Sequence, residues 1–297
     1  MGHNTSFLTR IANNVLYILD DSQLAELKSL ATAQLRQIDL YGYQRYPIMM
    51  AFRRLISGDA PAGSAGLNLN SLKLASRGLY LLDGQISFDR AQLYANIFKS
   101  LSSAQRQYLD NMKGKGWNSW PVISDDFVRE RLRGLPPGTA VAVMTYASDL
   151  FSWYVGSIEA DVYFCPERHG TYYGGFYIKD APAVGHEGYS ISEQLTATAG
   201  SALCDSTRGY VNQEEADIIS SLVDTQRYNL YAGAMNIVAL RTQIATMLRS
   251  LQDAESDAEA VRKQVLELSA QYGDLDGENN FHYATKFAQV YACLLYT

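Results

Sequence analysis

The side chains best able to do chemistry gather between positions 159 and 186, near the middle of the 297-residue chain. They include carboxylates, a thiol and two imidazoles, which are the groups that bind metal ions in proteins. A thiolate combined with imidazole and carboxylate suits zinc, iron or copper better than magnesium or calcium. The sequence therefore offers a candidate transition-metal site, whose possible ligands are Glu159, Asp161, Cys165, Glu167, His169 and His186.

A purely structural interpretation of the same segment needs no metal. Asp161 can pair with Arg168 or cap a turn, because both groups lie close in sequence. Cys165 can be an ordinary buried thiol, and His169 can close the turn with a backbone hydrogen bond. The lack of an HExxH pattern or of any recurring ligand spacing favours this interpretation. A catalytic pair of Cys165 and His169 is favoured least, because a helix end broken by Pro166 rarely gives nucleophile–base geometry.

A glycine- and tyrosine-rich stretch follows, from Gly170 to Tyr177. It lacks the lysine and the glycine spacing of a phosphate-binding loop. We expect a tight loop in which Tyr172, Tyr173 and Tyr177 either line a pocket or pack on the helices. The sequence leaves these two roles open.

Composition limits the function classes. With 47% hydrophobic and 19% charged residues the chain is of the globular type, and it is unusually rich in tyrosine, with 21. Its net charge is -6 and it has no basic stripe, so we expect no nucleic-acid partner. The longest nearly apolar run covers 139–164 and is interrupted by charges such as Asp149. We therefore expect a buried central helix and no transmembrane segment.

An internal repeat lies on both sides of the segment that holds the candidate metal ligands. The sequence LDGQISF at 82–88 returns as LDGENNF at 275–281, and further matches follow at the same offset. We therefore expect three parts in one compact unit: a helical copy at 1–113, a central helix with a Tyr/Gly-rich loop at 114–210, and a second copy at 211–297.

The repeated residues indicate helix starts and packing faces. Phe88, Ala91, Ala95 and Phe98 recur at helical spacing and predict a buried face, which the second copy repeats with Phe281, Ala284, Ala288 and Tyr291. We interpret Asp83 and Asp276, each followed by glycine, as residues that cap the start of a helix.

Two further helix starts share a second pattern. Asp20 is followed three residues later by Gln23, and Ser102 by Gln105, which predicts a capping box at each position. A weaker example begins at Asn212.

The segments that contain these boxes, Leu19–Gln23 and Leu101–Gln105, resemble the Leu-Thr-x-x-Gln motif of the periplasmic LTxxQ stress-chaperone family. Neither segment has the threonine of that motif. The resemblance implies a helical protein of the periplasm, or another extracytoplasmic compartment, that binds unfolded clients or senses envelope stress.

Tyrosines also cluster at Tyr41, Tyr43 and Tyr46, ahead of Arg53 and Arg54. They could form a peptide groove or a cation–π cluster, but packing against the other repeat is the interpretation we favour.

These features predict an all-α helical bundle of two duplicated antiparallel-helix units with an inserted central helix and a long irregular loop. For function they favour a non-enzymatic protein that binds a protein or peptide partner, with a metal site at the central loop as an added expectation. The alternatives are a metalloprotein or metalloenzyme centred on Cys165, Glu167 and His169, and a structural subunit of a larger assembly.

Overall fold

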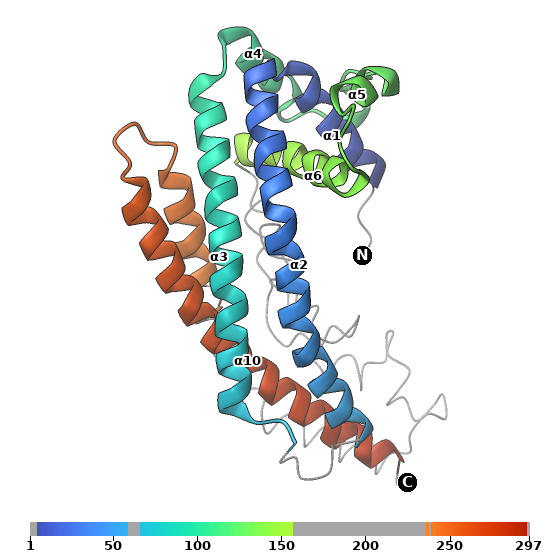
Figure 1. Ribbon diagram of the computed structural model, residues 1–297, viewed down its shortest axis with the longest axis vertical. Coiled ribbons are helices and arrows are strands. Elements are labelled where there is room, and N and C mark those ends of the chain that lie inside the picture. The colour runs from blue at the N-terminus through green and yellow to red at the C-terminus, as the bar shows by residue number, and fades with distance from the viewer. Residues whose placement is uncertain (1–4, 59–65, 157–235, 238, 296–297) are drawn as a thin grey trace. The chain divides into compact units, whose positions relative to one another are not determined.

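The computed structural model describes residues 5–58, 66–156, 236–237 and 239–295 (Figure 1). Within these ranges every regular element is a helix and there is no strand. The prediction of an all-α protein with packed helices is confirmed for this part of the chain.

The helices differ widely in length. The short ones are α1 (Thr5–Ile18), α4 (Ser103–Met112), the 3-10 turn η1 (Trp117–Ser119), α5 (Asp125–Arg131) and α6 (Pro137–Tyr154). The long ones are α2 (Asp21–Ser57), α3 (Leu69–Ser100) and α10 (Ala258–Leu295). One more helical stretch covers 239–250.

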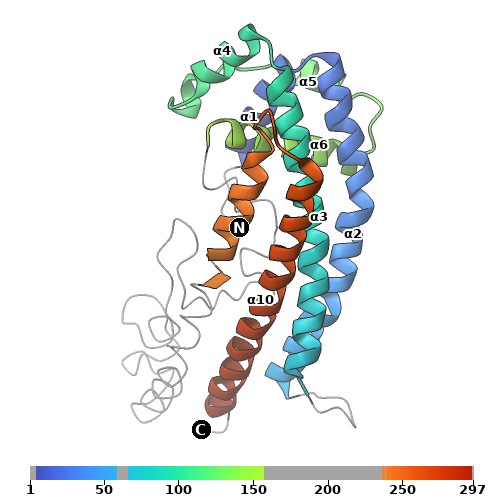
Figure 2. The same cartoon turned by 90° about the vertical axis from the view of Figure 1, so that its left-hand side faces the viewer.

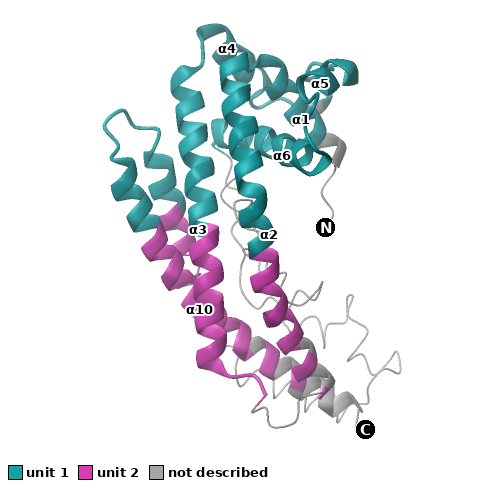
Figure 3. Cartoon of the chain, in the orientation of Figure 1, with its two compact units in different colours: residues 1–40, 84–164, 245–265 teal, residues 41–83, 165–244, 266–297 magenta. Residues whose placement is uncertain are grey.

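The chain divides into two compact units, coloured separately in Figure 3. Unit 1 comprises residues 1–40, 84–164 and 245–265, and unit 2 comprises 41–83, 165–244 and 266–297. The long helices α2, α3 and α10 each contribute residues to both units. The division of the sequence into parts at 113/114 and 210/211 stays a prediction.

In unit 1, α1 packs against α6 and α5. Apolar side chains at helical spacing bury one face of each helix, among them Ile11, Val15, Val143 and Leu150. The predicted face of α3 is confirmed, because Phe88, Ala91, Ala95 and Phe98 are all buried.

In unit 2, α3 and α10 approach each other very closely, and Figures 1 and 2 show them side by side. A β-carbon placed on Gly273 would lie 2.6 Å from the Cα of Arg77, and one on Gly277 would lie 3.0 Å from the Cα of Lys73. Glycine is therefore required at this helix contact for lack of space.

Side chains next to these glycines also connect α3 with α10. The rings of Tyr80 and Tyr272 lie 4.4 Å apart between their centroids, and both side chains are buried. Arg77 forms an ion pair of 2.5 Å with Asp274, the residue after Gly273. Because that pair is partly exposed, we attribute most of the stabilisation to the packed rings and backbones.

The interpretation of Asp83 and Asp276 as helix caps is wrong. Both residues lie inside continuous helices, α3 and α10, where the backbone amides are already bonded within the helix. The Asp276 side chain instead accepts a hydrogen bond of 2.8 Å from Asn280, one turn further along α10. Close packing of the helices offsets the poor helix propensity of the neighbouring glycine.

The central helix is shorter than predicted. α6 begins at Pro137 and ends at Tyr154, so it occupies only the first part of the apolar run at 139–164. Gly156 follows with a φ of 72°, a left-handed conformation that commonly stops a helix and favours glycine. Among the residues with described positions, no helix is both long and apolar enough to cross a bilayer.

Candidate functional site

The two predicted capping boxes are present at the starts of α2 and α4. Asp20 Oδ1 accepts from the Gln23 amide at 2.9 Å, and Gln23 Oε1 accepts from the Asp20 amide at 3.0 Å. In the second box Ser102 Oγ and Gln105 Oε1 make the matching bonds, at 3.3 Å and 2.8 Å. These side chains satisfy amides that a helix start leaves without partners.

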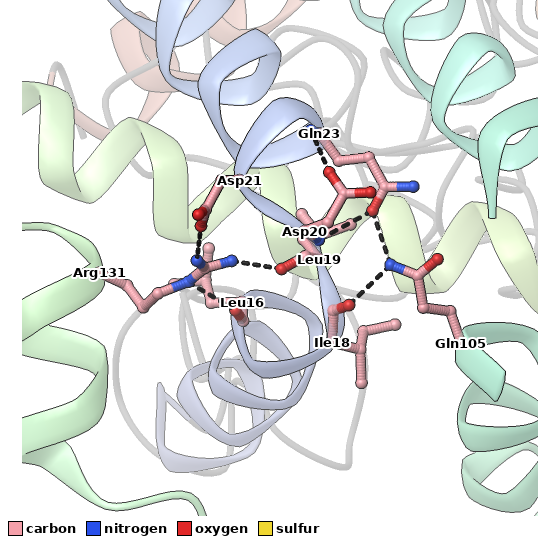
Figure 4. Close-up of polar contacts among 8 residues, drawn as sticks. All are labelled: Leu16, Ile18, Leu19, Asp20, Asp21, Gln23, Gln105 and Arg131. Carbon is pink, nitrogen blue, oxygen red and sulfur yellow. Dashed lines mark hydrogen bonds and ion pairs between the residues drawn. The ribbon is translucent and has the colours of Figure 1, made fainter. Parts of the chain in front are cut away.

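The two boxes also contact each other, as Figure 4 shows. The Gln105 side-chain amide donates to Gln23 Oε1 at 2.7 Å and to the Ile18 carbonyl at 2.7 Å. Gln105 therefore ties the start of α4 to the start of α2 and to the end of α1. The residue spacing predicts each box, but not this contact between them.

Arg131, the last residue of α5, also contacts the segment between α1 and α2 (Figure 4). Its guanidinium donates to the carbonyl of Leu16 in the last turn of α1, at 3.2 Å, and to that of Leu19, the residue after α1. It also pairs with Asp21 at 2.6 Å. The Asp21 side chain is almost fully exposed, so we attribute the anchoring mainly to the carbonyl bonds.

Three aromatic rings meet at the surface beside this junction. The Tyr17 ring of α1 lies 5.8 Å from that of Tyr108 on α4 and 5.5 Å from that of Phe127 on α5, measured between centroids. Tyr17 is 49% exposed, whereas Tyr108 and Phe127 are half-buried. We call these three residues the aromatic junction surface.

Neighbouring polar groups fix the edge of this surface. The Tyr108 hydroxyl donates to Asn14 Oδ1 at 2.6 Å, and Asn14 Nδ2 donates to the Pro121 carbonyl at 3.1 Å. Partial burial, and then the nearby Tyr17, raise the pKa of Tyr108, so its hydroxyl stays a donor at neutral pH. Val122, next to Pro121, is 79% exposed and adds an apolar side chain to the same stretch of chain.

We call the contacts of Gln23, Gln105 and Arg131 the polar junction. The polar junction and the aromatic junction surface are formed by neighbouring residues of the same helices. Tyr17 lies between Leu16 and Ile18, whose carbonyls receive the anchoring bonds. Tyr108 lies three residues after the anchor Gln105, and Phe127 lies four residues before the anchor Arg131. These spacings correspond to one helical turn, so each polar anchor orients the ring on its own helix.

Unit 2 exposes tyrosines as well. Tyr41 is buried, as the packing interpretation predicts, but Tyr43 and Tyr46 are 79% and 62% exposed. For these two residues the packing interpretation is wrong, because successive turns of α2 present different residues to solvent.

The candidate metal and loop residues lie outside the described part of the chain. These are Glu159, Asp161, Cys165, Glu167, His169 and His186, together with Tyr172, Tyr173 and Tyr177. Within the described ranges no group of three or more His, Cys, Asp or Glu side chains is arranged to hold a metal ion. A transition-metal site in 159–186 stays a prediction.

No protein-family model, curated protein or solved structure matches this chain.

Proposed function

We propose that this chain is a non-enzymatic helical binding protein that holds a protein or peptide partner on the aromatic junction surface. The observation that carries the proposal is the half-exposed ring of Tyr17, which makes tilted contacts with two further rings from α4 and α5. Three helices are needed to assemble this feature, and each has a polar anchor close to its ring.

Such a surface suits binding for a physical reason. Aromatic side chains bury a large area while losing few rotamers, and tyrosine adds a polar tip. Contact among the three rings orders them before a partner arrives, which lowers the entropy cost of association. Aromatic residues of this kind commonly supply the largest share of the binding energy at protein interfaces.

The resemblance to the LTxxQ family supports a client with exposed apolar or aromatic side chains. The motif-like segments Leu19–Gln23 and Leu101–Gln105 contain the capping boxes that anchor α2 and α4 at this surface. We therefore propose an unfolded or partly unfolded polypeptide as the partner, in an extracytoplasmic compartment. The motif residues act as the support of the surface, and the rings make the contact.

Aggregation of a reduced client tests the proposal. Insulin B chain is released by reduction, and its light scattering is followed with near-stoichiometric amounts of the full chain or of Tyr17→Ala and Phe127→Ala variants. We expect suppression by the full chain and an approximately tenfold higher half-maximal concentration for each variant, since losing an aromatic contact typically costs roughly 1–2 kcal/mol of binding.

Val141→Ala is the matched control, because Val141 is exposed on α6 and belongs to neither the polar junction nor the aromatic junction surface. It should suppress aggregation like the unchanged protein. Far-UV circular dichroism verifies that every variant keeps its helices. The proposal is wrong if the unchanged chain does not suppress aggregation, or if Val141→Ala and Tyr17→Ala lose the same activity.

A further inference from the structure

Two carboxylates border the aromatic junction surface at the start of α2. Asp20 and Asp21 come three and four residues after Tyr17, and both side chains are exposed (Figure 4). Asp21 pairs with Arg131 at 2.6 Å. The Asp20 side chain accepts the capping-box bond from Gln23 and makes no ion pair within the described part of the chain. One negative charge on this side of the surface therefore lacks a countercharge.

The start of α5 supplies three more carboxylates. Asp125 and Asp126 directly precede Phe127, and Glu130 follows it by three residues. Asp126 and Glu130 each pair with the arginine three residues further along the chain. The Asp125 side chain is exposed, and among the described residues it has neither an ion pair nor a hydrogen bond. A second negative charge therefore lies unpaired near a ring of the surface.

The edge of the aromatic junction surface is negative as a result. Its five carboxylates face only the three arginines of α5 and of the turn after it. On α4 the positions one turn before and after Tyr108 carry uncharged side chains, so that side adds no compensating base. The nearest base on α1, Arg10, lies about two helical turns before Tyr17.

These charges are close enough to act on a bound segment. Two residues of an α-helix rise by only about 3 Å, so Asp125 lies near Phe127 even though the two point to different faces. Salt screens exposed charges over about 8 Å at physiological ionic strength. Both unpaired carboxylates therefore influence what settles on the rings, with a strength that falls as salt is added.

We propose that the aromatic junction surface prefers a cationic client segment, in which an arginine or lysine lies next to an apolar side chain. This inference rests on the proposed binding function. The Tyr17 ring is 49% exposed, and an aromatic face attracts a cation. The carboxylates of Asp20 and Asp125 add to that attraction. The apolar neighbour of the cation packs on Phe127 and the exposed Val122.

The rings and the carboxylates have separate tasks in this arrangement. Burial of aromatic area supplies most of the affinity for any segment with apolar side chains. Exposed charges add little affinity each, but they speed the approach of an opposite charge and repel a like one. The sign of the client charge should therefore change binding in a salt-dependent way, whereas loss of a ring should weaken every client.

Two labelled peptides that differ only in the sign of their charge test the preference. One has four repeats of Arg-Phe-Ser and the other four repeats of Glu-Phe-Ser, and fluorescence anisotropy follows their binding to the full chain. We expect the arginine peptide to bind about tenfold more tightly at low ionic strength, because opposite charges attract and like charges repel. This ratio should shrink as salt is raised.

A pair of double variants locates the charges responsible. Asp20→Asn combined with Asp125→Asn removes the two unpaired charges, and asparagine caps a helix as well as aspartate does. This variant should bind the arginine peptide about fivefold more weakly, as expected for the loss of two exposed charges. Glu255→Gln combined with Glu267→Gln removes the same total charge from exposed positions outside α1, α2, α4 and α5, and should keep the full preference.

The outcomes separate this inference from the proposed function. Equal binding of both peptides, weakened alike by Tyr17→Ala, refutes the charge preference but leaves the binding function in place. If neither peptide binds, the inference fails, and suppression of client aggregation then decides whether the proposed function fails with it. Equal losses in the two double variants would show that the overall charge of the chain acts, and would overturn the role of Asp20 and Asp125.

Discussion

Gly273 on α10 and Gly78 on α3 differ in what an added methyl group would meet. At Gly273 it would lie 2.6 Å from the Cα of Arg77 and 2.8 Å from the Ser76 carbonyl oxygen, both backbone atoms that cannot move aside separately. At Gly78 nothing lies within 4 Å. The same substitution should therefore have opposite effects at the two positions.

We predict that Gly273→Ala lowers the free energy of unfolding by about 2 kcal/mol, because α10 must move away from α3 to admit the methyl group. Gly78→Ala, the matched control, should raise it by about 0.5–1 kcal/mol, because alanine costs less conformational entropy in a helix. Urea unfolding followed by far-UV circular dichroism measures both. Equal effects of the two substitutions would show that the close contact of α3 with α10 is absent.

At the scale of helices, local features can be predicted from the sequence better than contacts between elements. The capping boxes at Asp20 and Ser102 were predicted because each involves residues three apart. The bond from Gln105 to Gln23 spans 82 positions, and no spacing rule reveals it. The aromatic junction surface was missed for the same reason, since its rings come from three separate helices.

The Asp-Gly repeat failed as a prediction for a different reason. Glycine after aspartate suggests a helix boundary when a helix is considered alone. In the structure Gly277 is at a site where another backbone approaches, so tertiary packing overrides the local preference. Both Asp-Gly stretches lie inside long helices, α3 and α10, and neither marks where its helix begins.

We predict that Gln105→Ala lowers the free energy of unfolding by about 1–2 kcal/mol. The change removes one side of a capping box and two tethering bonds to Ile18 and Gln23. Gln107→Ala, an exposed position on the same helix, should change it by less than about 0.5 kcal/mol. Chemical unfolding of the two variants in parallel gives the comparison.

We also expect Gln105→Ala to weaken client binding. Because Gln105 orients α4, the Tyr108 ring should lose its fixed position beside Tyr17. Weaker suppression of client aggregation should therefore accompany the loss of stability. A variant with normal suppression but reduced stability would separate the capping function from the support of the surface.

At the scale of the whole molecule, the two compact units are joined by continuous helices. α2, α3 and α10, of 37, 32 and 38 residues, each run from one unit into the other. If one unit unfolded alone, each helix would break inside its hydrogen-bonded ladder and leave amides and carbonyls without partners. A helix end made in this way lacks a cap, so partial unfolding is costly.

The tryptophans make this coupling measurable. All three, Trp117, Trp120 and Trp153, belong to unit 1, whereas Gly273 belongs to unit 2. We predict that Gly273→Ala moves the urea midpoint seen by tryptophan fluorescence as far as the midpoint seen by circular dichroism, because unfolding is one cooperative transition. An unchanged fluorescence midpoint beside a shifted, two-step dichroism curve would instead show that unit 1 persists after unit 2 has unfolded, and that the shared helices can break between the units.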